Sequence, residues 1–323
     1  MQPVSIVVTV LNEAQDIGRV VASLLAQDPP AAEVVVVDGG STDGTWEWLV
    51  EAQRRAPRLR AIRDESCNLK HCAGPISRGR NVAISLATSD TLACADAGCT
   101  YAPEWLAHLT APLAAGQAEY ALGGCTLDPE GATIWDAASA AFFGVRLSPT
   151  APTKSCTARS MAFTRALWQR VGGFPESTFF GEDSLFDAKV RALTRPAFVA
   201  DAKARYRPQY TFRSASAQLA RYAYADGQTG IRWARLFRNA LRCLAHVAAL
   251  ACLPWSIWPF VIVFLVQAWV AFERDGRDLV RFWPRAILAR FAFAVAVPWI
   301  VTVNQLRGRL SKQQLSNRQN IGD

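Results

Sequence analysis

The residues of this chain that could do chemistry are carboxylates that follow short apolar runs. Four consecutive valines, residues 34–37, lead into Asp38, and a turn with two glycines, Ser41 and Asp43 follows. β-Branched residues without alternating polar ones predict a strand buried on both faces. A buried strand that ends in a carboxylate and a glycine turn is where open α/β sheets bind nucleotides. The alternative is that Asp38 and Asp43 only form the turn and cap the next helix.

A second polar segment, residues 74–83, begins with a Gly-Pro turn and opens a predicted helix that ends near Ala87. Cations at a helix N-terminus oppose the helix dipole, and a nearby anion would remove that conflict. We therefore interpret Arg80, or its neighbour Arg78, as a phosphate ligand and Asn81 as a ligand of a base or ribose. The alternative is an ordinary helix start that happens to be basic.

Two further motifs carry carboxylates. Residues 92–95 predict a strand that ends at Asp96, and Gly98 follows two residues later. Glu182 and Asp183 follow a glycine and open a predicted helix, where acidic side chains are also ordinary residues that favour the dipole. Carboxylates of this kind can bind a divalent cation or accept a proton as a general base.

The first predicted strand, residues 4–10, also ends in a polar pair, Asn12 and Glu13. In this order and spacing the motifs resemble those of family 2 glycosyltransferases with the A-type fold, from residue 4 to about residue 210. The resemblance implies an α/β fold with a mostly parallel sheet that binds a nucleotide-diphosphate sugar. The residues assigned to nucleotide binding are Asn12, Glu13, Asp38, Ser41, Asp43, Arg80, Asn81 and Asp96.

The resemblance also assigns chemical roles. Asp183 takes the position of the general base, and Glu182 that of a residue orienting the acceptor or a neighbouring group. Asp96 stands in the family's Asp-x-Asp motif, which holds Mg²⁺ or Mn²⁺ against the diphosphate. Gly98 replaces the second aspartate here, so we expect weaker metal binding than two carboxylates would give. The implied reaction is an inverting transfer of a sugar to an acceptor hydroxyl.

Two other functions fit parts of this pattern. A non-catalytic membrane scaffold that retains the fold is consistent with the loss of the second aspartate. A nucleotidyltransferase could share the strand and glycine turn, but it would usually have a glycine-rich, lysine-containing loop near the N-terminus, which residues 11–14 lack.

The elements that must position these residues alternate along the chain. Helices are predicted at 13–27 and 46–55 and a strand at 59–63, an alternation typical of a parallel sheet with right-handed crossovers. Later strands are predicted at 118–124 and 160–164. We expect the long connection 125–157 to shape the acceptor pocket, because long connections carry recognition.

Charge is unevenly distributed in the chain. Its formal net charge is +8, but residues 231–323 hold 13 Lys and Arg against 4 Asp and Glu, which accounts for the whole excess. Because this basic segment also holds the longest apolar runs, it favours an anionic membrane surface over nucleic acid. The eight cysteines form no CxxC pair, which fits a reducing cytosol and gives no zinc-ligand spacing. No signal peptide is predicted at the N-terminus.

Two apolar runs, 243–272 and 286–306, predict membrane segments, and Arg290 is expected to snorkel to the interface. We expect a catalytic domain at 1–213, an amphipathic connection at 214–242, and a membrane segment with a basic tail at 243–323. The runs are compatible with two spans or with a re-entrant hairpin permitted by two prolines. The expected location is the cell inner membrane, with the catalytic domain cytoplasmic and a lipid-linked saccharide as acceptor.

Overall fold

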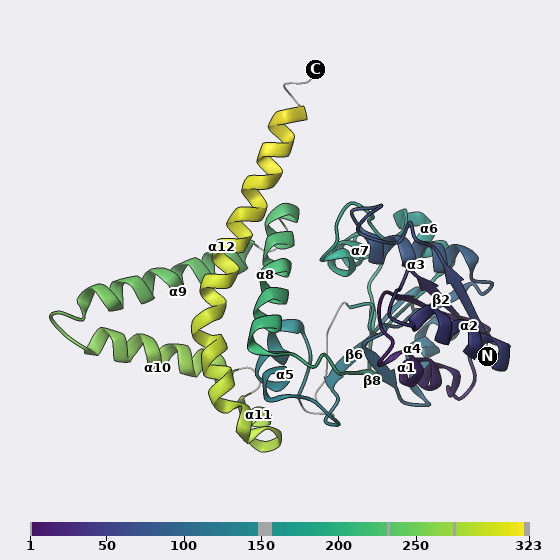
Figure 1. Cartoon of the computed structure of the whole chain (residues 1–323), viewed down its shortest axis with the longest axis horizontal. Coiled ribbons are helices and arrows are strands. Elements are labelled where there is room, and N and C mark those ends of the chain that lie inside the picture. The colour runs from purple at the N-terminus through teal and green to yellow at the C-terminus, as the bar shows by residue number, and fades with distance from the viewer. Residues whose placement is uncertain (1, 148–156, 231–232, 274–275, 320–323) are drawn as a thin grey trace. The chain divides into compact units, whose positions relative to one another are not determined.

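The computed structural model describes residues 2–147, 157–230, 233–273 and 276–319 (Figure 1). The chain forms two compact units, which we call the first and the second unit. The first comprises Met1–Asp128 and Thr150–Arg207, and the second comprises Pro129–Pro149 and Pro208–Asp323. Each is described by itself.

The first unit is built on one eight-stranded sheet, in the order β3-β2-β1-β4-β7-β6-β8-β5. Its strands are β1 Val4–Val10, β2 Glu33–Asp38, β3 Leu59–Arg63, β4 Thr91–Cys94, β5 Cys99–Tyr101, β6 Tyr120–Leu127, β7 Met161–Thr164 and β8 Ala197–Tyr206.

The predicted parallel pairing is confirmed for β3, β2, β1 and β4. Beyond β4 the sheet is mixed, because β7 runs antiparallel to both β4 and β6. β7 enters the sheet from the long connection after β6 and not through a helical crossover, so the crossover rule does not set its direction. Val10 of β1 pairs with Asp38 of β2, so the loops after both strands emerge at the same edge of the sheet.

Six helices of the first unit carry or cover this sheet among the residues described. They are α1 Ile17–Leu25, α2 Thr45–Arg55, α3 Pro75–Leu86, α4 Trp105–Ala114, α6 Arg165–Val171 and α7 Glu182–Arg191.

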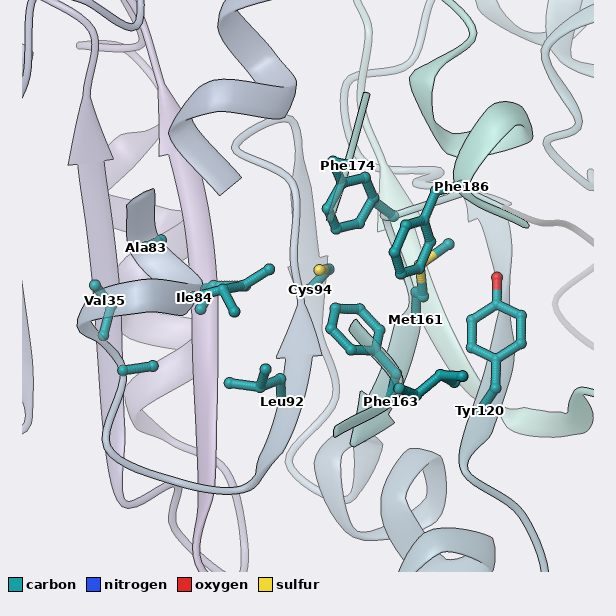
Figure 2. Packing of buried hydrophobic residues seen from close by; sticks show 14 of the residues in the cluster. Val35, Ala83, Ile84, Leu92, Cys94, Tyr120, Met161, Phe163, Phe174 and Phe186 are labelled. Atoms are coloured by element: carbon teal, nitrogen blue, oxygen red, sulfur yellow. The ribbon is translucent and has the colours of Figure 1, made fainter. Parts of the chain in front are cut away.

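An aromatic cluster fixes the position of α7. Phe186 of α7 stacks on Phe174 with ring centroids 4.1 Å apart, and it lies 5.2 Å from Phe163 of β7. Figure 2 shows these three rings together, beside Cys94 and Leu92 of β4. All are buried, so the start of α7 is anchored to the central strands of the sheet.

The second unit is helical, and α12 is its central helix. α12 packs against α5, α8, α9 and α10. Gly227 of α8 and Gly308 of α12 let these two backbones approach closely, because a Cβ at either glycine would overlap the other helix's backbone. Its elements are α5 Ile134–Ser139, a 3₁₀ turn Ala140–Phe143, α8 Phe212–Thr229, α9 Trp233–Cys252, α10 Trp258–Glu273, α11 Gly276–Phe282, a 3₁₀ turn Pro284–Ala286 and α12 Ile287–Gln319.

The structure divides the chain differently from the expected boundaries at 213 and 242. Residues 214–229 lie in α8 and residues 233–242 in α9, and residues 129–147 belong to the second unit. The reason is packing: α5 lies against α12, and the Trp135 and Phe293 rings meet edge to face at 6.1 Å. Part of the expected recognition segment, 148–156, lies outside the described residues.

The apolar runs are confirmed as helices, with differences. The run 243–272 is split between α9 and α10 by a turn at 253–257, where a break was predicted from Pro254. Among the described residues one helical stretch, Pro284–Lys312, is long and apolar enough to cross a membrane by length and composition. The prediction that Arg290 snorkels is wrong, because its side chain is buried and donates a hydrogen bond to the Ala138 carbonyl at 2.8 Å.

Candidate active site

The loops after β1 and β2 are bound to each other. The backbone N–H groups of Asn12 and Glu13 donate to Ser41 Oγ and Thr45 Oγ1, each at 2.8 Å. Asn12 Oδ1 in turn accepts from the Thr42 N–H. Three of the predicted nucleotide ligands, Asn12, Ser41 and Asp43, therefore brace this pair of loops, since Asp43 also accepts from the Ala14 and Thr45 N–H groups.

Asp38 has two different oxygens. Its Oδ1 accepts from the N–H groups of Gly40 and Ser41, each at 2.9 Å, which is the turn role predicted as the alternative. Its Oδ2 is buried and has no hydrogen-bond partner among the residues described. A buried carboxylate oxygen without a donor is costly, so this atom is available to a ligand that supplies one.

Glu13 and Asp96 lie close enough to influence each other. Burial raises the pKa of Glu13 to about 7, and the charges of Asp96, Asp16 and Asp43 add to that effect. Asp96 is half-buried and held at its backbone, because its N–H donates to Tyr101 Oη at 2.8 Å. Its Oδ1 accepts from the Gly98 N–H at 3.1 Å. Glu13, after the end of β1, and Asp96, after the end of β4, therefore lie near each other.

Tyr206 lies where the second aspartate of the family's motif would project. A Cβ placed on Gly98 would lie 3.1 Å from the Tyr206 ring, which is tighter than most real contacts. The Arg159 guanidinium lies over the same ring, 4.2 Å from its centroid. An aspartate at position 98 would therefore require the tyrosine to move. Sequence reasoning missed Tyr206, because only the pairing of β5 with β8 brings it to Gly98.

The described residues contain no group of three or more His, Cys, Asp or Glu side chains placed to hold a metal ion. Mg²⁺ is often bound through one or two carboxylates together with substrate phosphates and waters. Asp96, with Glu13 nearby, fits that kind of site and not an all-protein cage.

The acidic pair at the start of α7 is held by Arg80. Its Nη1 donates to Glu182 Oε1 at 3.0 Å and to Asp183 Oδ1 at 2.9 Å. Asp183 Oδ2 accepts from the Ala158 N–H at 3.1 Å. The side chain of Asp183 is 21 % exposed and that of Glu182 only 10 %, so Asp183 is the carboxylate that an acceptor can reach.

Burial separates the roles of the two acids. It raises the pKa of Glu182 to about 7, with the charge of Asp183 acting in the same direction and Arg80 opposing it. The charges of Asp183, Glu182 and, more weakly, Asp96 raise the pKa of Arg80, so its guanidinium stays charged despite burial. Glu182 therefore binds a proton more readily than an exposed glutamate does.

Arg80 and Asn81 contact other parts of the protein, and their binding of a nucleotide stays a prediction. In this structure the anion at the start of α3 is the acidic pair of α7. The Asn81 amide donates to the Phe174 carbonyl and to Glu176 Oε1, and it accepts from the Phe174 N–H. Asn81 therefore fastens the segment before α7, and Arg78 does so as well through Glu176.

A family model, Glycosyl transferase family 2, matches residues 5–166. The succinoglycan biosynthesis protein ExoU of Rhizobium meliloti is 38% identical over 106 residues. That match covers 33% of this chain and 29% of the relative's length.

Solved structures of low sequence identity share the fold. The mannosyltransferase PcManGT of Pyrobaculum calidifontis, in complex with GDP-Man and Mn²⁺, has a TM-score of 0.56 at 22% identity, over 94% of this chain and 87% of that one. Residues 1–349 of S. aureus TarS give 0.50 at 19% identity, over 97% and 91%. GalNAc-T7 with UDP, GalNAc and Mn²⁺ gives 0.51 at 18% identity, over 71% and 48%. With half its length matched by the family model, and with the A-type fold, this chain belongs to glycosyl transferase family 2 and is a glycosyltransferase.

Proposed function

We propose that the enzyme moves a sugar from a nucleotide-diphosphate donor to an acceptor hydroxyl with inversion, using Asp183 as the base. The observation that carries the proposal is the position of Asp96. Its charge acts on Glu13, beside the loops after β1 and β2, and also on Arg80, which holds Asp183. A donor bound at those loops would thus present its diphosphate near Asp96 and its sugar near the base.

Asp38 is the proposed ligand of the nucleotide. Its unpartnered Oδ2 would accept a hydrogen bond from a ribose hydroxyl or a base N–H. The likeness to a mannosyltransferase solved with GDP-Man supports a nucleotide at this edge of the sheet. We expect Asp38→Asn to weaken UDP or GDP binding by about tenfold, as one charge-assisted hydrogen bond is worth. Calorimetry measures this, with Glu51→Gln on the exposed face of α2 as control. Unchanged affinity for both nucleotides would leave Asp38 a turn residue only.

The proposed metal ligand is Asp96. Mn²⁺ is present in two of the similar structures, and Mg²⁺ would suit the same oxygen. When bound, the cation would neutralise charge on the leaving diphosphate. Because position 98 is a glycine and supplies no second carboxylate, we expect weak binding that chelation reverses readily.

Asp183 would accept the proton of the acceptor hydroxyl as its oxygen attacks the anomeric carbon. The new C–O bond forms while the bond to the diphosphate breaks, and the diphosphate leaves with the electron pair. One such in-line displacement inverts the anomeric centre. Arg80 and the Ala158 N–H fix the direction of the carboxylate, and a lone pair on each of its oxygens remains to accept the proton.

The proposed acceptor is a lipid-linked saccharide, and the proposed location is the inner membrane with the first unit in the cytoplasm. The basic excess of residues 231–323 and the exposed apolar helices of the second unit support a membrane. The relative named for succinoglycan biosynthesis supports polysaccharide assembly as the setting.

The test is sugar transfer from a panel of nucleotide sugars, with and without a membrane lipid extract, in Mn²⁺, in Mg²⁺ and in excess chelator. We expect transfer from one donor, stimulated by the extract and reversibly lost on chelation. No transfer at all would favour a scaffold, and full activity in chelator would remove the metal from the proposal. Conversion of the donor, on addition of pyrophosphate, to a nucleoside triphosphate and a sugar 1-phosphate would favour a nucleotidyltransferase.

A further inference from the structure

The helical hairpin formed by α9 and α10 has the most exposed apolar surface of the second unit. The two helices pack side by side in opposite directions and are joined at residues 253–257 (Figure 1). The Trp255 side chain in this turn is 84 % exposed, and the Trp258 side chain at the start of α10 is 68 % exposed. From Cys243 to Phe272 the sequence has no ionised side chain. Water is a poor solvent for such a surface.

The exposed side chains surround much of α10. Trp258 and Trp269 lie on one side of the helix, and Phe260, also exposed, lies on nearly the opposite side at 3.6 residues per turn. A groove on a protein partner would cover one face of a helix, whereas lipid surrounds it. A helix that is apolar on all sides is typical of a bilayer or a protein core.

The hairpin is too short to cross a bilayer. α10 has 16 residues, which at about 1.5 Å each span roughly 24 Å, less than a hydrocarbon core of about 30 Å. The basic side chains lie at the other end of the hairpin, away from its turn: Arg238 near the start of α9, and Arg277, Arg281 and Arg285 after the end of α10. All four are exposed, where anionic headgroups would attract them.

α12 does not behave like a second span, although its composition would allow it. Its candidate stretch is 44% buried inside the chain. Arg290 and Phe293 are buried near its start and Gln305 and Gly308 near its end, all on one face. If α12 crossed a membrane, α8 would enter the hydrocarbon core beside it, together with the Asp226–Arg235 ion pair. Its exposed apolar side chains form one narrow stripe: Leu288, Val295, Trp299, Val303, Leu306 and Leu310.

We propose that the chain is monotopic: the α9–α10 hairpin enters one leaflet of an anionic membrane, turn first, and no segment reaches the far side. This rests on the proposed membrane attachment and specifies its form. In this arrangement the arginines of α11 and the start of α9 both lie on the cytoplasmic side, where membrane proteins carry an excess of positive charge. With two spans, the same arginines would lie outside.

The first test is labelling by a membrane-impermeant maleimide, with the wild-type chain as background for its native cysteines. Single variants of the full chain place a cysteine in the hairpin turn (Ser256→Cys), in α11 (Arg277→Cys) and late in α12 (Arg307→Cys). We expect labelling at 277 and 307 from the cytoplasmic side, and at 256 only after detergent is added. Labelling of any of the three from the outer side overturns the proposal while leaving membrane attachment intact. Full-length chain in the soluble fraction would overturn both the monotopic insertion and the membrane attachment. Sugar transfer is measured in parallel and does not depend on the labelling or on the fractionation.

The second test is flotation with vesicles of phosphatidylcholine containing phosphatidylglycerol. The double change Trp255→Glu and Trp258→Glu should lower the bound fraction by about tenfold or more, because two interfacial aromatic side chains are lost. Trp48→Glu in α2, also an exposed tryptophan, is the matched control and should bind as wild type does. Both replacements are at exposed sites, and circular dichroism checks that each variant is folded. Undiminished binding by the double variant would show that the turn does not enter the membrane.

Discussion

Arg80 in the first unit and Arg290 in the second are both almost completely buried, at 4 % and 3 % exposure. Each lies over a phenylalanine ring, 5.5 Å from Phe174 and 5.0 Å from Phe142. They differ in the acceptors described for them. Arg80 binds two carboxylates, whereas Arg290 binds the Ala138 carbonyl.

The difference shows two uses of the same side chain. A buried guanidinium between carboxylates favours their ionised forms and fixes their orientation, which suits a reacting group. A buried guanidinium on a backbone carbonyl fastens one element to another, here α12 to α5. We therefore expect substitutions around Arg80 to alter catalysis and substitutions at Arg290 to alter only local stability.

The largest effect is expected at the carboxylate that Arg80 orients. Asp183→Asn keeps the shape of the side chain and removes its basicity, so kcat should fall by about 10²–10⁴-fold while donor affinity changes little. Steady-state kinetics together with calorimetry of donor binding measure both. Asp90→Asn, at a fully exposed carboxylate, is the control. If Asp183→Asn keeps more than about a tenth of the turnover, another group is the base.

Arg80→Lys tests the geometry of the contact while keeping the charge. The lysine ammonium reaches less far than Nη1 and lacks the rigid planar guanidinium, so it would not hold the two carboxylates at 3.0 and 2.9 Å and the base loses its orientation. We expect kcat to fall by about 10²-fold with little change in KM for the donor. A phosphate-binding Arg80 would instead raise KM for the donor and leave kcat nearly unchanged.

Arg290→Met is the corresponding change in the second unit. Losing a hydrogen bond from a charged donor should destabilise the contact of α12 with α5 by about 1.5–3 kcal/mol. Faster hydrogen exchange of the α5 amides, 134–139, would report this locally, and Arg285→Met at an exposed site is the control. Nucleotide affinity should be unchanged. A loss of nucleotide binding would contradict the separation of the two uses.

The smallest effect concerns pH. Folding raises the pKa of Glu182 from 4.5 to about 7, so between these values the folded chain binds a proton that the unfolded chain has released. Unfolding therefore becomes easier as pH rises through this window. Glu182→Gln should flatten the dependence, measured as melting temperature of the full chain in detergent. Glu51→Gln, on an exposed side chain, should leave the slope of melting temperature against pH unchanged. The same slope in Glu182→Gln as in the wild type would contradict proton binding by Glu182.

The first half of the sheet could be predicted from the chain alone, because its signals are local. Runs such as the four valines before Asp38 suit only a strand buried on both faces, and their alternation with amphipathic helices sets parallel order. The predicted strand 59–63 matches the observed β3. The carboxylates after the strands, such as Asp38 and Asp96, could also be predicted as site residues from the sequence, because each directly follows a run that predicts a buried strand.

Tertiary structure decided which of those polar residues face each other. The sequence places Arg80 and Asp183 103 residues apart, and only the Phe174–Phe186 stack, which anchors α7 beside β4 and β7, brings carboxylates to the guanidinium. The same holds for Tyr206 at Gly98, which depends on the pairing of β5 with β8. Hydropathy likewise marked residues 286–306 as apolar, but burial of one face of α12 is a property of its neighbours. Composition records how apolar a segment is, while the fold decides whether protein or lipid covers it.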